Sequence, residues 1–232
     1  LEKKEIPELI KINKKIKEQP ADTASLMADF LSITDGITLS LQGPPGTGKT
    51  TVTGELIARL VDKNKKIVVS SQTHEAINNL LKSVQRKAET LKTNPLIIKL
   101  SSGTSEKSDQ RSLSGTKVHT LRENDLNYEP NVLGATVFSL VKERFGEKPY
   151  DLLVIDEAGQ VSLSNLLFMS HCARNILLVG DQNQLSQPNR AKHPGDSGLS
   201  CLDYVMGEEK VVSANRGVFL ATSWRMPPVL TS

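Results

Sequence analysis

The chain has 232 residues, of which 38% are hydrophobic and 24% are charged, so it can bury the core of one large domain. A net charge of +3 permits a nucleic-acid partner without arguing for one, because domains that bind nucleic acid through charge alone are usually more basic. The two cysteines lack CxxC spacing and only four histidines are present, which argues against a zinc site and for a reducing, cytoplasmic location. No apolar run approaches the roughly 20 residues of a membrane helix, so we expect no membrane partner.

The N-terminal region predicts a helix. Residues 2–18 place isoleucines and a leucine at near-helical spacing among lysines and glutamates. A packing helix is favoured over a nucleic-acid arm, and residues 1–20 could also form a stalk or linker ahead of a main domain at 21–232. Because the chain starts at Leu1 and not at methionine, we expect a piece of a longer protein.

The middle of the chain alternates short apolar runs with helical patterns. Helices are expected at 26–31, 52–61 and 76–84. The expected strands are 37–41, 66–71, 96–100, 132–138, 152–155, 176–179 and 218–222. This alternation predicts an α/β fold, in which a mainly parallel sheet carries helices on both faces and binds ligands at the carboxyl ends of its strands.

One segment lacks the apolar pattern. Residues 101–117, SSGTSEKSDQRSLSGTK, are rich in Ser, Lys, Gly and Thr and contain a single leucine. We expect a mobile loop or a small insertion here, extending to about residue 125.

A glycine-rich stretch, GPPGTGKT, occupies residues 43–50 and matches the phosphate-loop pattern G-x-x-x-x-G-K-[ST]. An apolar run precedes it and a helical pattern follows it, which is the context that this motif needs. Glycines let backbone N–H groups turn toward phosphate oxygens, Lys49 supplies a charge for the outer phosphates and Thr50 can hold Mg²⁺. The expected nucleotide contacts are Gly43, Pro44, Pro45, Gly46, Thr47, Gly48, Lys49, Thr50 and Thr51.

Two adjacent carboxylates, Asp156 and Glu157, directly follow the apolar run 152–155. Neighbouring acids are costly to desolvate unless a cation lies against them. With a phosphate loop in the same chain, we expect Asp156 to hold Mg²⁺ and Glu157 to act as the catalytic base that polarises the attacking water. The alternative is that both residues only cap the next helix, since acids suit helix N-termini.

Two further positions could contact the γ-phosphate. Gln184 follows the apolar run 176–179, and a neutral amide there can bond both the phosphate and the attacking water, although a polar turn closed by Asp181 explains the pattern equally well. Arg225 lies in SWRMPP, and arginine suits a fork of bonds to a terminal phosphate. An arginine followed by prolines is otherwise typical of a surface turn.

Six motifs in this order resemble the first RecA-like motor domain of superfamily 1 helicases, in the branch of the up-frameshift RNA helicase and the Okazaki nuclease-helicase. They are GPPGTGKT, SSQTHEAINNLL, GATVFSL, VIDEAGQ, LVGDQNQLSQP and SWRMPP. The details HEAINNLL, DEAGQVSL and LSQPNRAKHP look closest to bacterial proteins that join a RecB-like nuclease to such a helicase.

The resemblance implies a P-loop NTPase that binds ATP and Mg²⁺. It assigns catalytic contacts with the γ-phosphate to Gln184 and Arg225. Trp224, directly before that arginine, stands where the family usually has tyrosine and is expected to contact the nucleotide. Gln19 is the nearby candidate for the glutamine that reads adenine. The second motor domain, which carries an arginine finger, lies outside the chain, and such a finger is worth roughly 10³ to 10⁵ in rate. We therefore expect the chain to bind nucleotide better than it hydrolyses it.

The resemblance also implies a track for a single nucleic-acid strand, formed by Ser71, Thr73, His74 and Thr136. Hydroxyls and backbone amides at strand ends can hold phosphates and sugars without reading sequence. The expected function is an ATP-dependent DNA helicase or translocase moving 5′ to 3′ on single-stranded DNA, with a second RecA-like domain and a RecB-like nuclease as possible partners in the parent protein. The alternatives are an RNA helicase of the same branch and a P-loop switch ATPase that remodels a protein partner.

Overall fold

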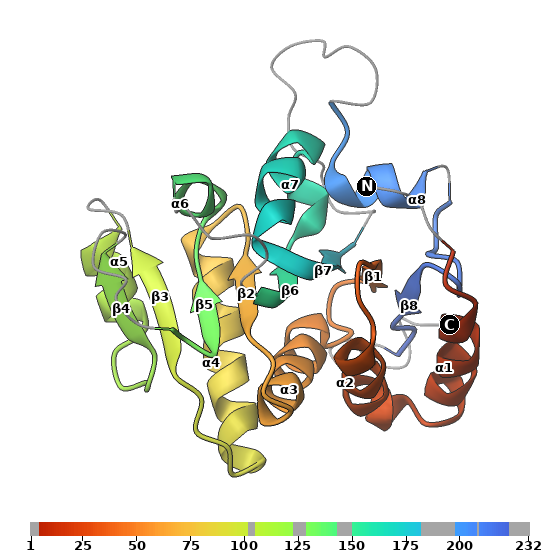
Figure 1. Ribbon diagram of the computed structural model, residues 1–232, viewed down its shortest axis with the longest axis horizontal. Coiled ribbons are helices and arrows are strands. Elements are labelled where there is room, and N and C mark those ends of the chain that lie inside the picture. Colours follow the sequence, from red (N-terminus) through yellow and green to blue (C-terminus); the bar gives the residue numbers. More distant parts are fainter. Residues whose placement is uncertain are drawn as a thin grey trace.

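The computed structural model describes residues 5–101, 105–122, 129–142, 150–181, 198–207 and 209–222. Within these residues the chain builds one eight-stranded sheet in the order β4-β3-β5-β2-β6-β7-β1-β8, and every neighbouring pair is parallel (Figure 1). The strands are β1 (Thr38–Gln42), β2 (Ile67–Ser70), β3 (Ile97–Ser101), β4 (His119–Arg122), β5 (Val132–Gly134), β6 (Tyr150–Ile155), β7 (Ala173–Gly180) and β8 (Gly217–Phe219). The predicted parallel α/β architecture is confirmed.

Helices cover both faces of the sheet (Figure 1). They are α1 (Pro7–Glu18), α2 (Thr23–Ile33), α3 (Lys49–Asp62), α4 (His74–Thr90), α5 (Glu106–Ser112), α6 (Val137–Lys142), α7 (Leu163–Met169) and α8 (Cys201–Met206). Short 3₁₀ turns lie at η1 (Pro20–Asp22), η3 (Ala158–Gln160) and η4 (Ser170–Cys172). Among the helices of these described ranges, none has the length and apolar character that a membrane crossing requires.

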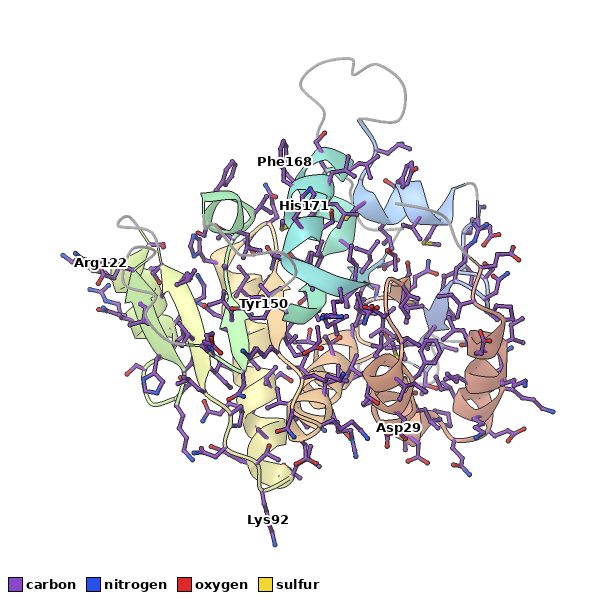
Figure 2. All side chains as sticks on the ribbon, in the orientation of Figure 1. Asp29, Lys92, Arg122, Tyr150, Phe168 and His171 are labelled. Carbon is purple, nitrogen blue, oxygen red and sulfur yellow. The ribbon has the colours of Figure 1, made fainter. Side chains whose placement is uncertain are left out.

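Two apolar cores lie on opposite faces of the sheet. On β6, Leu152 and Val154 belong to the core beneath α1 to α4, whereas Leu153 and Ile155 belong to the core beneath α6, α7 and α8. The division follows from the period-2 alternation of side chains along a strand. Charged residues such as Asp29, Lys92 and Arg122 point outward from these layers (Figure 2).

Helix α1 packs on the domain and continues its core. Leu9 is fully buried, and the buried Asn13 side chain donates to Gly217 O at 2.8 Å and to Ala214 O at 2.9 Å. These contacts join the first helix to the segment that leads into the edge strand β8. The favoured packing role of this helix is therefore confirmed.

Two segments differ from the expected local structure. The segment predicted as a mobile loop or a small insertion is not only loop, because it contains α5 and leads into β4, which extends the sheet beyond β3. The strand predicted at 132–138 ends at Gly134, because Thr136 caps the start of α6 by accepting from Ser139 N at 3.4 Å. Low hydrophobicity hid α5 and β4, since their side chains lie at the edge of the sheet, where burial is partial.

Candidate functional site

The phosphate loop connects β1 to α3 at the carboxyl edge of the sheet. Gly46 and Gly48 adopt φ values of 84° and 81°, which side chains rarely tolerate, and Gly48 is the N-cap residue of α3. A Cβ atom on Gly43 would lie 2.6 Å from Thr47 Oγ1. The glycines of the motif are therefore required by the backbone path, which brings the N-terminus of a 14-residue helix to the loop.

Lys49 folds back over this loop. Its Nζ donates to Gly43 O at 2.5 Å and to Pro44 O at 3.1 Å, while Thr47 Oγ1 donates to the same Pro44 carbonyl at 2.9 Å. The ammonium group is thus held where the loop would surround phosphates. Carbonyl oxygens are weaker partners than phosphate oxygens, so a bound triphosphate would compete well for the lysine.

Asp156 and Glu157 follow β6 at the same edge. Asp156 N donates to Ser70 O at 2.9 Å, and Asp156 Oδ1 accepts from Glu157 N at 3.0 Å. Burial raises the pKa of Asp156 to about 6, and the neighbouring Glu157 charge adds to the effect, while the positive charge of Lys49 opposes it. The site therefore holds a carboxylate whose charge is incompletely compensated.

Glu157 adopts a left-handed backbone conformation with φ 54°. Such a conformation in a residue with a side chain costs on the order of 1 kcal/mol and is common at functional sites. It makes Glu157 the N-cap of the turn η3, whose Gln160 N donates to Glu157 O at 2.8 Å. Glu157 thus begins a 3₁₀ turn, but its side chain makes no capping hydrogen bond there, and the helix-cap alternative does not explain the charges around Asp156.

Three charges from separate chain crossings converge at this edge. Burial lowers the pKa of Lys49, and the negative charges of Asp181 and Asp156 act against that lowering. The sheet order β6-β7-β1 explains the arrangement, because β7 places Asp181 between the acid pair and the phosphate loop. We call Lys49, Asp156 and Asp181 the nucleotide cluster.

Asp181 is the member of the cluster that the sequence did not single out. It was considered only as the residue that closes a turn, yet it is 4% exposed and follows β7 directly. Its position in the sequence could have indicated a role in the site, because Asp181 follows an apolar run as Asp156 does.

The donor set fits Mg²⁺ bound together with phosphates. In the described part of the chain no three His, Cys, Asp or Glu side chains gather as a metal site. Mg²⁺ does not need such a cage, since it is held by one or two carboxylates together with substrate phosphates and water. Asp156 supplies an under-compensated carboxylate, and Thr50 lies in the first turn of α3.

A cavity of about 190 Å³ opens beside the phosphate loop. Its lining includes Thr47 of the loop and Val52 of α3, together with Ile16 and Lys17 of α1 and Pro20. Gln19 lies between the last two of these residues in the sequence and forms the C-cap of α1. The N-terminal helix is thus close enough to the loop to form part of the same site.

The residues expected to form the nucleic-acid track lie after β2 and its neighbour β5. Thr73 is exposed and caps α4 by accepting from Ala76 N at 3.2 Å, while the Thr136 and Ser139 hydroxyls lie 3.0 Å apart. Ser71 is fully buried and its hydroxyl has no hydrogen-bond partner within the described residues, so the structure does not present it to a ligand. Gln184, Trp224 and Arg225 lie outside the described residues.

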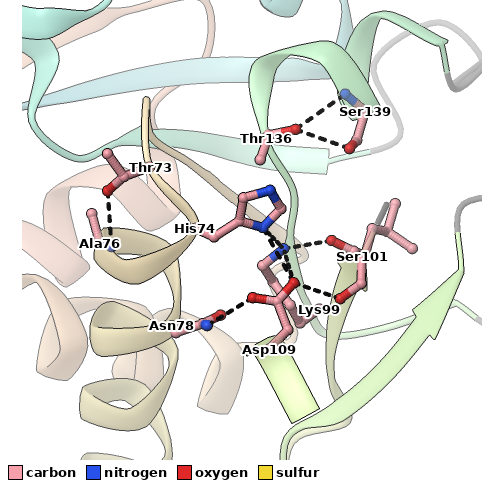
Figure 3. Close-up of polar contacts among 10 residues, drawn as sticks. Thr73, His74, Ala76, Asn78, Lys99, Ser101, Asp109, Thr136 and Ser139 are labelled. Carbon is pink, nitrogen blue, oxygen red and sulfur yellow. Dashed lines mark hydrogen bonds and ion pairs between the residues drawn. The ribbon is translucent and has the colours of Figure 1, made fainter. Parts of the chain in front are cut away.

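His74 contacts two charged residues that sequence reasoning missed. Lys99 and Asp109 are buried beside it, in β3 and α5 respectively (Figure 3). A lysine inside the apolar run LIIKL was the available signal for a buried charge. Asp109 lies in the segment that was expected to be a mobile loop or a small insertion, and nothing in the sequence around it indicated a buried charge.

The comparisons with known proteins agree with this geometry. A family model described as an AAA domain matches residues 21–194. The chain is 30% identical over 176 residues to the DNA replication ATP-dependent helicase/nuclease dna2 of Schizosaccharomyces pombe, and the match covers 72% of this chain and 12% of that protein. It is 28% identical over 166 residues to the RecBCD enzyme subunit RecD of Mycolicibacterium smegmatis, covering 67% of this chain and 26% of that protein.

Among solved structures, the UvsW helicase from bacteriophage T4 aligns with a TM-score of 0.46 at 15% identity, over 84% of this chain and 58% of that one. The chain spans about an eighth to a quarter of the two curated relatives named above. Since the family model matches most of the chain, the chain belongs to the AAA domain family, with a RecA-like P-loop NTPase fold and homology to superfamily 1 helicases.

Proposed function

We propose that the chain is the first motor domain of an ATP-dependent superfamily 1 helicase or translocase that acts on single-stranded DNA. The observation that carries the proposal is the nucleotide cluster, in which a phosphate-loop lysine and two strand-end carboxylates converge from β1, β6 and β7. The curated names of the relatives, a helicase/nuclease and a RecBCD subunit, support a role on DNA.

Each residue of the nucleotide site has a definite task in this proposal. Lys49 leaves the loop carbonyls and binds the outer phosphates, while the N–H groups at the start of α3 bind phosphate oxygens. Thr50 and Asp156 hold Mg²⁺, which neutralises charge between the terminal phosphates. Glu157, the next residue after Asp156, orients and polarises the attacking water.

The cavity beside Thr47 suits the nucleobase. Its walls come from α1, α3 and the end of β8, and they are largely apolar, as a flat heterocycle requires. In this arrangement the N-terminal helix belongs to the motor domain and not to a separate stalk. Gln184 and Arg225 remain the proposed contacts with the γ-phosphate.

The nucleic-acid track runs across the carboxyl ends of β2 and β5. Thr73, His74 and Thr136 lie at this edge, on the opposite side of β6 from the phosphate loop. Backbone binding by hydroxyl and imidazole groups needs no base reading, which suits a motor that moves along any sequence. A second motor domain and a nuclease domain are the proposed partners in the parent protein.

The test is the ATPase rate of the full-length protein with and without oligo(dT). We expect strong stimulation by the oligonucleotide and a steep loss of that stimulation as salt rises, because backbone contacts release counterions. Stimulation by oligo(U) alone would assign the motor to RNA. No stimulation by either strand would overturn the helicase proposal and would favour a nucleotide switch that remodels a protein partner.

Three variants test which residues bind the nucleotide and which residue activates water. Lys49→Ala is expected to abolish binding of a fluorescent ATP analogue, whereas Lys63→Ala, at the exposed C-terminal end of the same helix, should bind normally. Glu157→Gln should retain binding and lose hydrolysis, since the amide cannot polarise water. Wild-type hydrolysis by the glutamine variant would show that Glu157 is not the base.

A further inference from the structure

A buried ion pair lies near the β4 end of the sheet, whereas the phosphate loop follows β1 near the other end. Lys99 Nζ and Asp109 Oδ2 are 3.5 Å apart, and both side chains have 0% exposure. Burying two charges costs more than their attraction returns unless further hydrogen bonds satisfy them. The partners of this pair therefore decide what it can do.

Asp109 accepts hydrogen bonds from two side chains, one on each oxygen. Asn78 Nδ2 donates to Oδ1 at 2.9 Å and Ser101 Oγ donates to Oδ2 at 2.7 Å. Burial alone would raise the pKa of Asp109, but these hydrogen bonds and the positive charge of Lys99 lower it below its usual value. The carboxylate is therefore ionised and held in one orientation by α4 and β3.

His74 closes this arrangement at the first residue of α4. Its Nδ1 lies 3.2 Å from Lys99 Nζ and 3.2 Å from Asp109 Oδ2 (Figure 3). The ring is 31% exposed, and its other nitrogen points away from the ion pair, on the side where Thr136 lies (Figure 3). We call His74, Lys99 and Asp109 the histidine cluster.

The ion pair restricts where the imidazole proton can reside. An ammonium group has only donors, so Nδ1 must accept when it bonds to Lys99. Nδ1 is equally far from Lys99 Nζ and Asp109 Oδ2; Lys99 Nζ also donates to Leu100 O at 2.5 Å, and Asp109 Oδ2 also accepts from Ser101 at 2.7 Å. A ring that accepts from Lys99 through Nδ1 is a neutral imidazole that carries its proton on Nε2.

We propose that Lys99 and Asp109 are positioning residues, which hold His74 through Nδ1 so that Nε2–H donates to a phosphate of a bound single strand. The inference rests on the proposed function, because it assumes that a nucleic-acid strand crosses the ends of β2 and β5. It adds a role for α5, whose Asp109 ties the segment after β3 to the start of α4.

The first experiment separates the two ring nitrogens. A glutamine amide can place a donor near the position of Nε2, whereas an asparagine amide reaches only the position of Nδ1. We expect His74→Gln to bind fluorescent oligo(dT) within about twofold of the wild type and His74→Asn to bind about tenfold more weakly, the value of one hydrogen bond. The matched control is His119→Asn, which changes an exposed histidine on β4 and should bind as the wild type does.

The outcomes separate this inference from the proposed function. If the wild-type chain does not bind oligo(dT) or oligo(U), both fail. If it binds one of them and the asparagine variant binds as well as the glutamine variant, the proposed function stands and the role of Nε2–H is refuted.

The second experiment tests action through the histidine. Lys99→Met keeps the length of the stem, and we expect it to weaken oligo(dT) affinity severalfold in the wild-type background but not in the His74→Ala background. A purely structural role would lower affinity equally in both backgrounds. Urea unfolding of each variant checks that the comparison is made between folded proteins.

The third experiment observes the proton directly. In ¹⁵N-labelled protein at neutral pH, we expect the His74 resonances of a neutral ring with Nε2–H and an unprotonated Nδ1. Lys99→Met should shift them toward Nδ1–H or a charged ring, because Asp109 then becomes the nearest partner. A neutral Nδ1–H ring in the wild type would overturn the proposal whether or not Lys99→Met folds.

Discussion

The nucleotide cluster and the histidine cluster each combine a lysine with a buried carboxylate, yet the pKa of the carboxylate is raised in the first cluster and lowered in the second. In the nucleotide cluster, burial raises the pKa of Asp156 to about 6. In the histidine cluster, hydrogen bonds and nearby positive charge outweigh burial and lower the pKa of Asp109. The difference lies in the partners, since Asp156 receives one backbone hydrogen bond whereas Asp109 receives two from side chains.

This contrast distinguishes a site built to receive a ligand from one that is complete by itself. An incompletely compensated carboxylate destabilises the protein without ligand and gains most when a cation arrives. A carboxylate that is already hydrogen-bonded and paired with a buried lysine gains less from a ligand and holds its neighbours in place. If the two carboxylates differ in this way, their substitution should change the stability of the chain in opposite directions.

The largest loss is expected for Asp109→Ala. It leaves the Lys99 charge buried without its carboxylate and removes the acceptor of Asn78 and Ser101, so we expect a loss of about 3–5 kcal/mol in the free energy of unfolding. Urea denaturation followed by circular dichroism measures it. The double variant Lys99→Met/Asp109→Leu should recover a large part of that loss, and failure to recover any of it would show that the charge balance is not the cause.

The opposite sign is expected for Asp156→Asn in the chain without nucleotide. The folded-state pKa of about 6 lies above the ordinary 3.8, so ionisation of Asp156 costs stability progressively as pH rises from about 4 to about 6. Removing the charge should therefore stabilise the folded chain by about 3 kcal/mol above pH 6 and have little effect below pH 4. Thermal unfolding across this pH range measures it, and a stability loss at pH 7 would contradict the assignment.

The pH dependence of the two clusters should also run in opposite directions. The pKa of Asp109 is lowered by folding, so its contribution is present above its ordinary value, about 4, and is lost as pH falls below that range. Comparing the wild type with Asp109→Asn and Asp156→Asn over the same pH series separates the two windows.

A smaller effect is expected from the strained backbone at Glu157. Glycine adopts φ 54° without the steric cost of a side chain, so Glu157→Gly should stabilise the fold by about 1 kcal/mol. The same variant should lose hydrolysis. Calorimetry measures the stability, and Asn64→Gly, at another left-handed residue with φ 59°, is the matched control for the backbone effect alone.

The smallest effect is expected for an exposed ion pair near the histidine cluster. Arg122 Nε lies 3.1 Å from Glu106 Oε2, but its side chain is 66% exposed. Arg122→Ala should change the free energy of unfolding by less than about 0.5 kcal/mol, because water and salt screen such pairs. A loss as large as that of Asp109→Ala would mean that the whole α5 region, and not the buried pair, controls stability.

The sequence predicted most of the sheet because its strands are buried on both faces and therefore appear as continuous apolar runs. Seven of the eight strands were located in this way, from Thr38 in β1 to Phe219 in β8. The strand β4 was missed because it lies at the sheet edge, where none of its four residues is buried. The same lack of burial hid α5, which has one buried residue, Asp109.

The phosphate loop and the acid pair could be located from the amino-acid sequence, because the backbone path needs glycines at fixed positions and the proposed chemistry needs Lys49 after the loop and Asp156 at the end of a strand. The neighbours of those groups became visible in the folded chain. Asp181 joins the nucleotide cluster through the sheet order, and Asp109 reaches His74 through the packing of α5 on α4. Contacts between residues far apart in the chain depend on how strands are ordered and helices packed, and local patterns of hydrophobicity do not record that order.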